Sequence, residues 1–347
     1  MENSESESQD EIPELQCQEG TSQASAKADY PNPDYIHSPE DYIFIKVLGE
    51  GSFGTVYQAI DINTNKICAI KVSLKRHIKR EKKIKHAFRE KEMLFYINER
   101  IKTTMPFFVK LFCTFQDHTR IFYVLSYANN GDLYQLIKKN GCFQINCAQF
   151  YAAEILHAVE YLHSINVMHC DLKPENILLD KKFHVLLSDF GCAKFIENDD
   201  EETEFKLEGT VHYLPPEMLK KKITNKYCDL WALGCISYEM IKGSPPFHAQ
   251  TEYLIFKQIL NLDYHFSEGF DPLMKDFVLR MLVINPEDRL GYHDKDGYPS
   301  IKEHSLFEGI DFDRLYSETS PMLLCFKEDS DSDEINQYKD LEPGLET

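Results

Sequence analysis

The sequence predicts an α+β fold of two lobes, a strand-rich small lobe followed by a helical large lobe. The small lobe should cover residues 38–127, where β-like runs such as DYIFIKVL and CAIK surround one prominent helical pattern. The large lobe should cover residues 128–315, which are mostly helical in pattern, as in AQFYAAEILHAVEYLH at 148–163 and DPLMKDFVLRML at 271–282. A chain of 347 residues is long enough for two lobes and a substantial core.

The acidity of the chain is concentrated at its two ends. The formal net charge is −19, of which residues 1–35 carry −8 and residues 316–347 carry −7. Segments rich in Ser, Glu, Asp and Gln cannot bury enough apolar surface to order themselves. We therefore expect acidic, disordered tails over residues 1–37 and 316–347. The run EDSDSDE at 328–334 also resembles a target of an acid-directed kinase.

The remaining composition excludes several classes of protein. The ten cysteines are scattered without a CxxC pair, which indicates reduced thiols rather than zinc ligands or a disulfide framework. No apolar run reaches 18 residues, and the N-terminus is acidic, so neither a transmembrane segment nor a signal peptide is expected. We expect a cytoplasmic protein, with the nucleus as an alternative location, and no nucleic-acid partner.

Two short motifs in the second half carry the clearest chemistry. Residues 169–176 read HCDLKPEN, and residues 189–191 read DFG. Asp171 can orient a hydroxyl group, and Asp189 follows Asn176 by 13 residues. This pair is typical of the catalytic and metal-binding loops of a protein kinase. Phosphoryl transfer needs an oriented hydroxyl, metal ions on the phosphates and positive charge near the transferred oxygens.

A glycine-rich segment in the first half agrees with this interpretation. Residues 49–56 read GEGSFGTV, and Lys71 follows about fifteen residues later in the β-like run CAIK. Glycines allow backbone amides to approach phosphate groups closely. The pattern alone is weak, but no βαβ unit with a ribose-binding acid surrounds it, so a dinucleotide-binding fold is a poor alternative.

Lys71 should contact the α- and β-phosphates of ATP and pair with a glutamate on the next helix. Residues 84–97 have an apolar helical stripe that carries both Glu90 and Glu92. Glu90 lies nearer the inward face, so we choose it over Glu92, although a solvated glutamate is the alternative for either.

The motif residues receive the remaining catalytic roles. Asp189 should bind Mg²⁺, and Asn176 a second Mg²⁺. Asp171 should accept or orient the substrate hydroxyl, and Lys173 should steady the γ-phosphate. Three further residues should be structural: an ion pair between Glu217 and Arg289, and a hydrogen-bond hub at Asp229.

Longer stretches resemble one group of kinases. HCDLKPEN, with its lysine two residues after the aspartate, is similar to serine/threonine rather than tyrosine kinases. The sequence from about residue 42 to 315 resembles the phosphoinositide-dependent protein kinases of the AGC group, through AIKVSLKRHIKR, PFFVKLFCTFQD, LSYANNGDL, FYAAEILHAVEYLH, CDLWALGCISYEMIKGSPPF, EYLIFKQIL and GYPSIKEHSLFEG. The resemblance implies the bilobal protein kinase fold, with ATP and Mg²⁺ as cofactors.

The resemblance also implies which residues surround the nucleotide. The hinge between the lobes should lie at Ser126, Tyr127 and Ala128, with Leu125 just before it at the back of the pocket. The full ATP-binding set is then Leu48, Gly49, Glu50, Gly51, Ser52, Phe53, Gly54, Val56, Ala69, Lys71, Leu125, Ser126, Tyr127, Ala128, Asp132, Glu175, Asn176, Leu178 and Asp189.

Members of this subfamily phosphorylate the activation loops of other AGC kinases and grip a phosphorylated hydrophobic tail on those substrates. The resemblance places a phosphate dock with an apolar floor at Lys75, Arg76, Ile78, Ile84, Lys91, Thr114, Gln116 and Ile121. The alternative is that the basic run at 71–85 is only a solvated helix face. Most AGC kinases fill this pocket with their own Phe-x-x-Phe motif, and no such motif follows Phe312, which favours an open dock.

Four departures from the family pattern matter. Cys170 replaces the arginine that normally pairs with an activation-loop phosphate, and Lys206 stands where the phosphorylated serine is expected. Lys91 replaces an arginine of the dock, which removes a bidentate contact. Only about 32 residues follow residue 315, whereas a lipid-binding pleckstrin-homology domain needs roughly 100. We therefore expect no such domain.

The sequence thus predicts an active serine/threonine kinase, with protein substrates among other AGC kinases. Two alternatives remain: an active kinase of another subfamily, and a pseudokinase that acts as a scaffold. Every catalytic position holds the expected residue type, which argues against the pseudokinase. Magnesium-dependent ATP turnover would separate the two.

Overall fold

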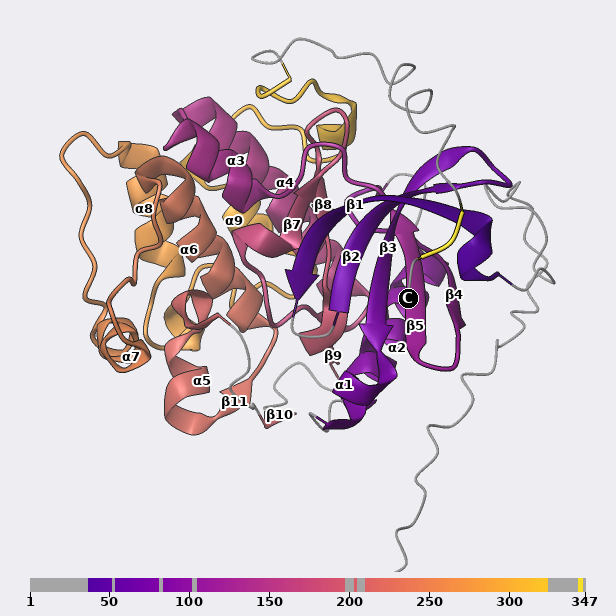
Figure 1. Ribbon diagram of the computed structural model, residues 1–347. Helices are drawn as coiled ribbons and strands as arrows, with labels where there is room; N and C mark the ends of the chain where they lie inside the picture. The colour runs from indigo at the N-terminus through magenta and orange to yellow at the C-terminus, as the bar shows by residue number, and fades with distance from the viewer. Residues whose placement is uncertain are drawn as a thin grey trace, which may run out of the picture.

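The computed structural model describes residues 37–51, 54–80, 84–101, 105–196, 203–204, 210–323 and 343–345. Its fold is α+β, as the sequence predicts: a five-stranded antiparallel sheet forms most of the first lobe, and helices form most of the second (Figure 1). Within the described residues no helix is long and apolar enough to cross a membrane.

The sheet of the small lobe has the strand order β1-β2-β3-β5-β4. Its strands are β1 (Tyr42–Gly51), β2 (Gly54–Asp61), β3 (Lys66–Leu74), β4 (Leu111–Gln116) and β5 (Arg120–Ser126). Strand β3 lies in the middle, where it pairs with β2 on one side and β5 on the other. This register places Lys71 between Val56 and Tyr123.

Two helices accompany the sheet, α1 (Lys75–Arg80) and α2 (Ile84–Arg100). The buried residues of α2 are Glu90, Met93, Leu94 and Ile97. Their spacing of three and four residues puts them on one face of a helix, as the periodicity of the sequence predicts. One charged residue therefore lies within an otherwise apolar helical face, and this carries Glu90 into the interior.

The large lobe is built around two long buried helices. Its helices are α3 (Leu133–Asn140), α4 (Ile145–Ser164), α5 (Pro216–Lys221), α6 (Tyr227–Lys242), α7 (Glu252–Asn261), α8 (Pro272–Met281) and α9 (Pro299–Lys302). Short strands connect them, namely β6 (Val167–Met168), β7 (Ile177–Leu179), β8 (Val185–Leu187), β9 (Lys194–Phe195), β10 (Thr203–Glu204) and β11 (Ile223–Thr224). Helices α4 and α6 are apolar on most sides because other elements surround them.

Part of the segment expected to be a disordered tail is ordered. Ser320 and Met322 are buried, and Met322 belongs to the core of the large lobe. The N–H of Gly344 donates to the carbonyl of Tyr42 at 2.8 Å, and Leu345 packs on the apolar cluster of the small-lobe sheet. The expectation of disorder for 316–347 is therefore wrong for these residues. The prediction relied on the acidic composition of the whole segment, which does not reveal that single apolar side chains such as Met322 and Leu345 can pack. Residues 1–36 and 324–342 lie outside the described part.

Candidate active site

The central feature of the site is an ion pair between strand β3 and helix α2 of the small lobe. Lys71 Nζ on β3 lies 2.5 Å from Glu90 Oε1 on α2, which confirms the predicted pairing and the choice of Glu90 over Glu92. Burial by itself would lower the pKa of Lys71. The nearby carboxylates of Glu90 and Asp189 outweigh burial and raise it, so the ammonium group stays charged.

The catalytic loop forms a second group of contacts, around Asp171. Lys173 Nζ donates to Asp171 Oδ2 at 2.7 Å, and Asn176 Nδ2 donates to the same oxygen at 3.0 Å. Asn176 Nδ2 also donates to the Asp171 backbone carbonyl at 2.8 Å. Burial raises the pKa of Asp171, and Lys173 offsets this only in part. These contacts fix the direction of the carboxylate and hold Lys173 beside it.

Asp189 faces the same space from the loop that follows β8. Burial favours its neutral form, but the charges of Lys71, His169 and Lys173 outweigh burial and lower its pKa. The next residue, Phe190, is fully buried and contacts the ring of His169, with 5.0 Å between the centroids. A buried anchor beside an ionised carboxylate keeps Asp189 in place.

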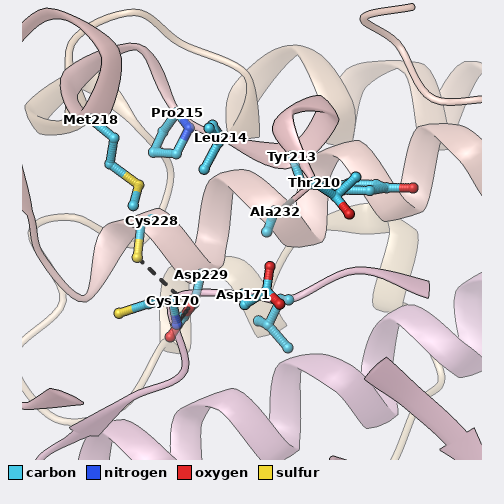
Figure 2. A pocket seen from close by; sticks show the side chains of 11 residues that line it. Cys170, Asp171, Thr210, Tyr213, Leu214, Pro215, Met218, Cys228, Asp229 and Ala232 are labelled. Carbon is cyan, nitrogen blue, oxygen red and sulfur yellow. Dashed lines mark hydrogen bonds between the residues drawn. The ribbon is translucent and has the colours of Figure 1, made fainter. Parts of the chain in front are cut away.

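Asp229 joins the catalytic loop to helix α6 and confirms the predicted hub. Its carboxylate accepts the backbone N–H groups of His169 at 2.8 Å and Cys170 at 2.9 Å. It also contacts His163 Nε2 at 2.8 Å. These hydrogen bonds and the nearby histidines lower the pKa of Asp229 despite its burial. Figure 2 shows Asp229 directly beside Cys170 and close to Asp171.

The sequence reasoning missed the role of His169. Its Nε2 donates to the carbonyl of Ser188 at 3.0 Å, and its Nδ1 accepts the backbone N–H of Asp171 at 3.3 Å. His169 therefore links the residue before Asp189 to Asp171. The available signal was its place as the first residue of HCDLKPEN.

The glycine-rich segment forms the β1–β2 hairpin at the edge of the site. Gly51 pairs with Gly54 across the turn, and Gly49 pairs with Val56. A Cβ atom at Gly54 would lie 1.9 Å from the carbonyl oxygen of Val72, so only glycine fits there. Glu50 lies between these glycines on β1. Ser52 and Phe53 lie outside the described residues.

The residues expected around the adenine come from both lobes. Leu48 on β1 is 42% exposed, and Ala69 on β3 pairs with Leu125 on β5. Leu178 lies on β7 and forms a bridge with Asp132, the N-cap residue of α3 in the large lobe. These positions place apolar side chains at several elements that meet between the lobes.

The hinge residues follow β5 directly. The N–H of Ser126 donates to the carbonyl of Lys110 at 2.9 Å, so this donor is not available to a nucleotide. Tyr127 and Ala128 continue the chain toward α3, and Asp132 caps that helix by accepting the N–H of Gln135 at 2.7 Å. Burial raises the pKa of Asp132, and it has the same effect on Glu175 in the catalytic loop.

The predicted structural ion pair is present deep in the large lobe. Both oxygens of Glu217 accept from the guanidinium group of Arg289, at 3.1 and 3.2 Å. Arg289 also donates to the carbonyl of Tyr227 at 2.6 Å. This bidentate contact ties the first turn of α5 to the segment that follows α8.

The residues predicted for docking lie on neighbouring elements of the small lobe. Lys75, Arg76 and Ile78 lie on α1, and Lys91 lies on α2. Thr114 and Gln116 lie on β4, and Ile121 lies opposite Gln116 on β5. The side chain of Ile84 lies outside the described residues, as does Lys206.

The arrangement fits magnesium and ATP. Asp189 is held ionised, and the amide nitrogen of Asn176 is used by Asp171 while its amide oxygen is a donor that Mg²⁺ prefers. Lys71 and Lys173 supply fixed positive charge for phosphate groups. Bound Mg²⁺-ATP would supply the phosphoryl group, and these residues would bind and orient it.

Comparison with known proteins agrees with this geometry. Residues 42–307 match the family model of the protein kinase domain. The chain is 43% identical over 307 residues to 3-phosphoinositide-dependent protein kinase 1 of Mus musculus, an alignment that covers 87% of this chain and 54% of that protein. It is 40% identical over 317 residues to serine/threonine-protein kinase ksg1 of Schizosaccharomyces pombe (88% and 51%) and 39% identical over 300 residues to serine/threonine-protein kinase PKH2 of Saccharomyces cerevisiae (83% and 27%).

The fold and the site define a protein kinase, and the chain belongs to the protein kinase family. Among its members it is similar to the serine/threonine kinases of the 3-phosphoinositide-dependent type, within the AGC group. The chain spans about half the length of the first of these relatives.

Proposed function

We propose that this chain transfers the γ-phosphoryl group of Mg²⁺-ATP to serine or threonine hydroxyls on other AGC kinases, at their activation loops. The observation that supports it most directly is the Lys71–Glu90 ion pair facing an ionised Asp189. In protein kinases this lysine and this metal-binding aspartate must both be in place for transfer.

Some residues of the site would bind Mg²⁺-ATP, and Asp171 would take the proton of the substrate hydroxyl. Lys71 would bind the α- and β-phosphates, and Asp189 and Asn176 would bind magnesium. Asp171, whose carboxylate is fixed by Lys173 and Asn176, would orient the attacking hydroxyl and accept its proton. Fixed charges of this kind stabilise the transferring phosphoryl group without reorganising during the reaction.

We further infer that the cluster on α1, α2, β4 and β5 binds a phosphorylated hydrophobic tail of the substrate. Lys75 Nζ donates to the carbonyl of Asp117 at 2.7 Å, and this contact fixes the side chain. An ammonium group has three N–H donors, so Lys75 can still donate to a phosphate group. Ile78 and Ile121 are 3% and 4% exposed, which suits the floor of a shallow site rather than its walls.

The test compares three substrates in Mg²⁺-ATP. They are an AGC kinase activation-loop polypeptide with a phosphorylated hydrophobic tail, the same polypeptide without the tail, and a generic basic serine peptide. We expect transfer to all three, with the highest kcat/KM for the tailed substrate. Equal kcat/KM with and without the tail would reject the docking proposal alone. No metal-dependent transfer to any substrate would favour the pseudokinase.

A further inference from the structure

Two cysteines meet at the junction of the catalytic loop and helix α6. Cys170 immediately precedes Asp171, and Cys228 immediately precedes Asp229. Both are thiols in this structure, and both line the same small pocket beside the activation segment. Figure 2 shows the side chain of Cys228 pointing toward that of Cys170 next to Asp229.

The two sulfur atoms share a neighbour. The Thr224 hydroxyl donates to Cys228 Sγ at 3.4 Å and lies 3.9 Å from Cys170 Sγ. Interaction with the Cys170 thiol and burial raise the pKa of Cys228. Two thiols that contact one hydroxyl group lie near enough for local adjustment to bring them to the sulfur–sulfur distance of a disulfide, about 2.05 Å.

We propose that Cys170 and Cys228 form a peroxide-sensitive thiol pair, whose disulfide reversibly switches off phosphoryl transfer. This inference depends on the kinase class of the chain and not on the choice of protein substrate.

The surroundings assign different roles to the two thiols. Cys170 is partly exposed, whereas Cys228 is only 4% exposed. Oxidation by peroxide also requires access to the sulfur atom, which favours the more exposed of the two thiols. Cys170 is therefore the thiol that peroxide oxidises first, and Cys228 is the thiol that resolves the product.

The chemistry balances in two steps. The Cys170 thiolate attacks one oxygen of hydrogen peroxide and the O–O bond breaks, which leaves a sulfenic acid on Cys170 and a hydroxide that takes up a proton. The Cys228 sulfur then attacks the sulfenic sulfur, and the S–O bond breaks. The proton of Cys228 leaves with that oxygen as water. Two thiols are oxidised by two electrons, and one peroxide is reduced to two waters.

The backbone couples this modification to catalysis. Cys170 has a φ of +65°, a left-handed conformation that is strained for a residue with a side chain. Its N–H is held by Asp229 at 2.9 Å, and the next residue is Asp171. A disulfide pulls on Cys170 between these two fixed points, so it displaces the catalytic carboxylate. A displacement of about 1 Å at a reacting group costs on the order of 100-fold in rate.

The experiment treats the full chain with graded hydrogen peroxide, blocks remaining thiols by alkylation and maps peptides without reduction. We expect a linked peptide pair that contains Cys170 and Cys228. We expect kcat for a generic serine peptide to fall roughly tenfold or more in parallel with that linkage, and dithiothreitol to restore it. ATP binding, measured by nucleotide fluorescence, should stay within about twofold because the glycine-rich hairpin, Lys71 and the hinge lie outside the catalytic loop.

Two single substitutions sharpen the test. Cys228→Ser keeps a hydroxyl beside Thr224 but removes the resolving thiol. It should give no linked peptide, and sulfenic acid should accumulate on Cys170, where a 1,3-dione traps it. Cys235→Ser, in the same helix and fully buried, is the matched control and should behave like the wild type. A link between Cys170 and Cys192, trapping at Cys228 first, or full activity in the linked protein would overturn the proposal.

Discussion

At the scale of single residues, the site depends on which ionisable side chains stay charged although burial disfavours their charged form. Lys71 and Asp189 are both partly buried, and each is held in its charged form by the other and by nearby groups. Asp171 differs, because burial raises its pKa and Lys173 offsets this only in part. We therefore expect Asp189 to hold metal and Asp171 to handle a proton, a division that follows from their surroundings.

The first prediction tests these two charges. Lys71→Met and Asp189→Asn should each abolish phosphoryl transfer, because they remove the phosphate contact and the metal carboxylate while leaving the core in place. Transfer to a serine peptide and the circular dichroism spectrum should be measured together. Lys66→Met, at the exposed start of the same strand, is the control. Retention of more than about 10% of wild-type turnover by either variant would contradict the assigned role.

The second prediction concerns a buried carboxylate outside the chemistry. Glu239 Oε2 accepts from the Tyr213 hydroxyl at 2.6 Å, and burial raises the pKa of Glu239 from 4.5 to about 7. Between these values the native state binds more protons than the unfolded state, so stability falls as pH rises through the window. Gln accepts the same hydrogen bond without titrating.

The measurement is the free energy of unfolding in urea at pH 5 and pH 8. Relative to Glu239→Gln, the wild type should lose on the order of 2 kcal/mol between these two pH values. Glu252→Gln, at an exposed position on α7, should follow the wild type. A difference between Glu239→Gln and wild type that does not change with pH would show that Glu239 does not titrate in this window.

At the scale of elements, α1 and the β4–β5 hairpin are joined by Lys75. Its backbone N–H donates to the carbonyl of Thr119 at 2.9 Å, and its Nζ donates to that of Asp117. These two contacts hold the start of α1 against the turn of the β4–β5 hairpin, directly after the strand that carries Thr114 and Gln116. A substrate tail bound here would act at a distance, by positioning rather than by chemistry.

The third prediction follows from that separation. Lys75→Ala combined with Gln116→Ala should lower kcat/KM for a substrate with a phosphorylated hydrophobic tail by about tenfold. The same double variant should phosphorylate a short peptide without the tail as well as the wild type does. Lys79→Ala, which removes one charge from the same helix, controls for net charge. Equal losses on both substrates would show that the cluster is structural or allosteric.

At the scale of the whole molecule, the chain lacks two residues that usually order the activation segment in this family: the arginine before the catalytic aspartate and the phosphorylated serine that it binds. Cys170 offers no cation, and the end of the segment is held by burial of Val211, Tyr213 and Leu214 and by the Glu217–Arg289 ion pair. The sequence offers Lys206, which lies outside the described residues, as a further support through local ion pairs, although exposed pairs contribute little. We therefore expect activity that does not depend on a phosphate in this segment.

The fourth prediction is therefore activity without activation-loop phosphorylation. Protein made in bacteria and treated with phosphatase should keep its turnover within about twofold, and Thr203→Ala should be nearly silent, because no arginine precedes Asp171 to receive a phosphate. Phosphate content by mass spectrometry and turnover should be measured on the same samples. A large drop that phosphate on Thr203 reverses would show that another cation replaces the missing arginine.

The sequence by itself determined the class of the protein and the identity of its central ion pair. The motif HCDLKPEN followed at a fixed spacing by DFG indicates phosphoryl-transfer chemistry without any knowledge of the fold. A helical period of 3.6 residues placed Glu90 on the inward face of α2. Local patterns of this kind survive in a single sequence because they depend on neighbours along the chain.

Only the tertiary structure decided which distant residues meet. The role of His169 depends on Ser188, the contact of both Cys170 and Cys228 with Thr224 depends on the docking of α6, and Leu345 reaches the first strand across the whole sequence. The direction of each pKa shift was likewise undecided by sequence, because burial and neighbouring charge oppose one another at Lys71 and Asp189. Such balances arise from packing between segments that are far apart in the chain, and no local pattern encodes them.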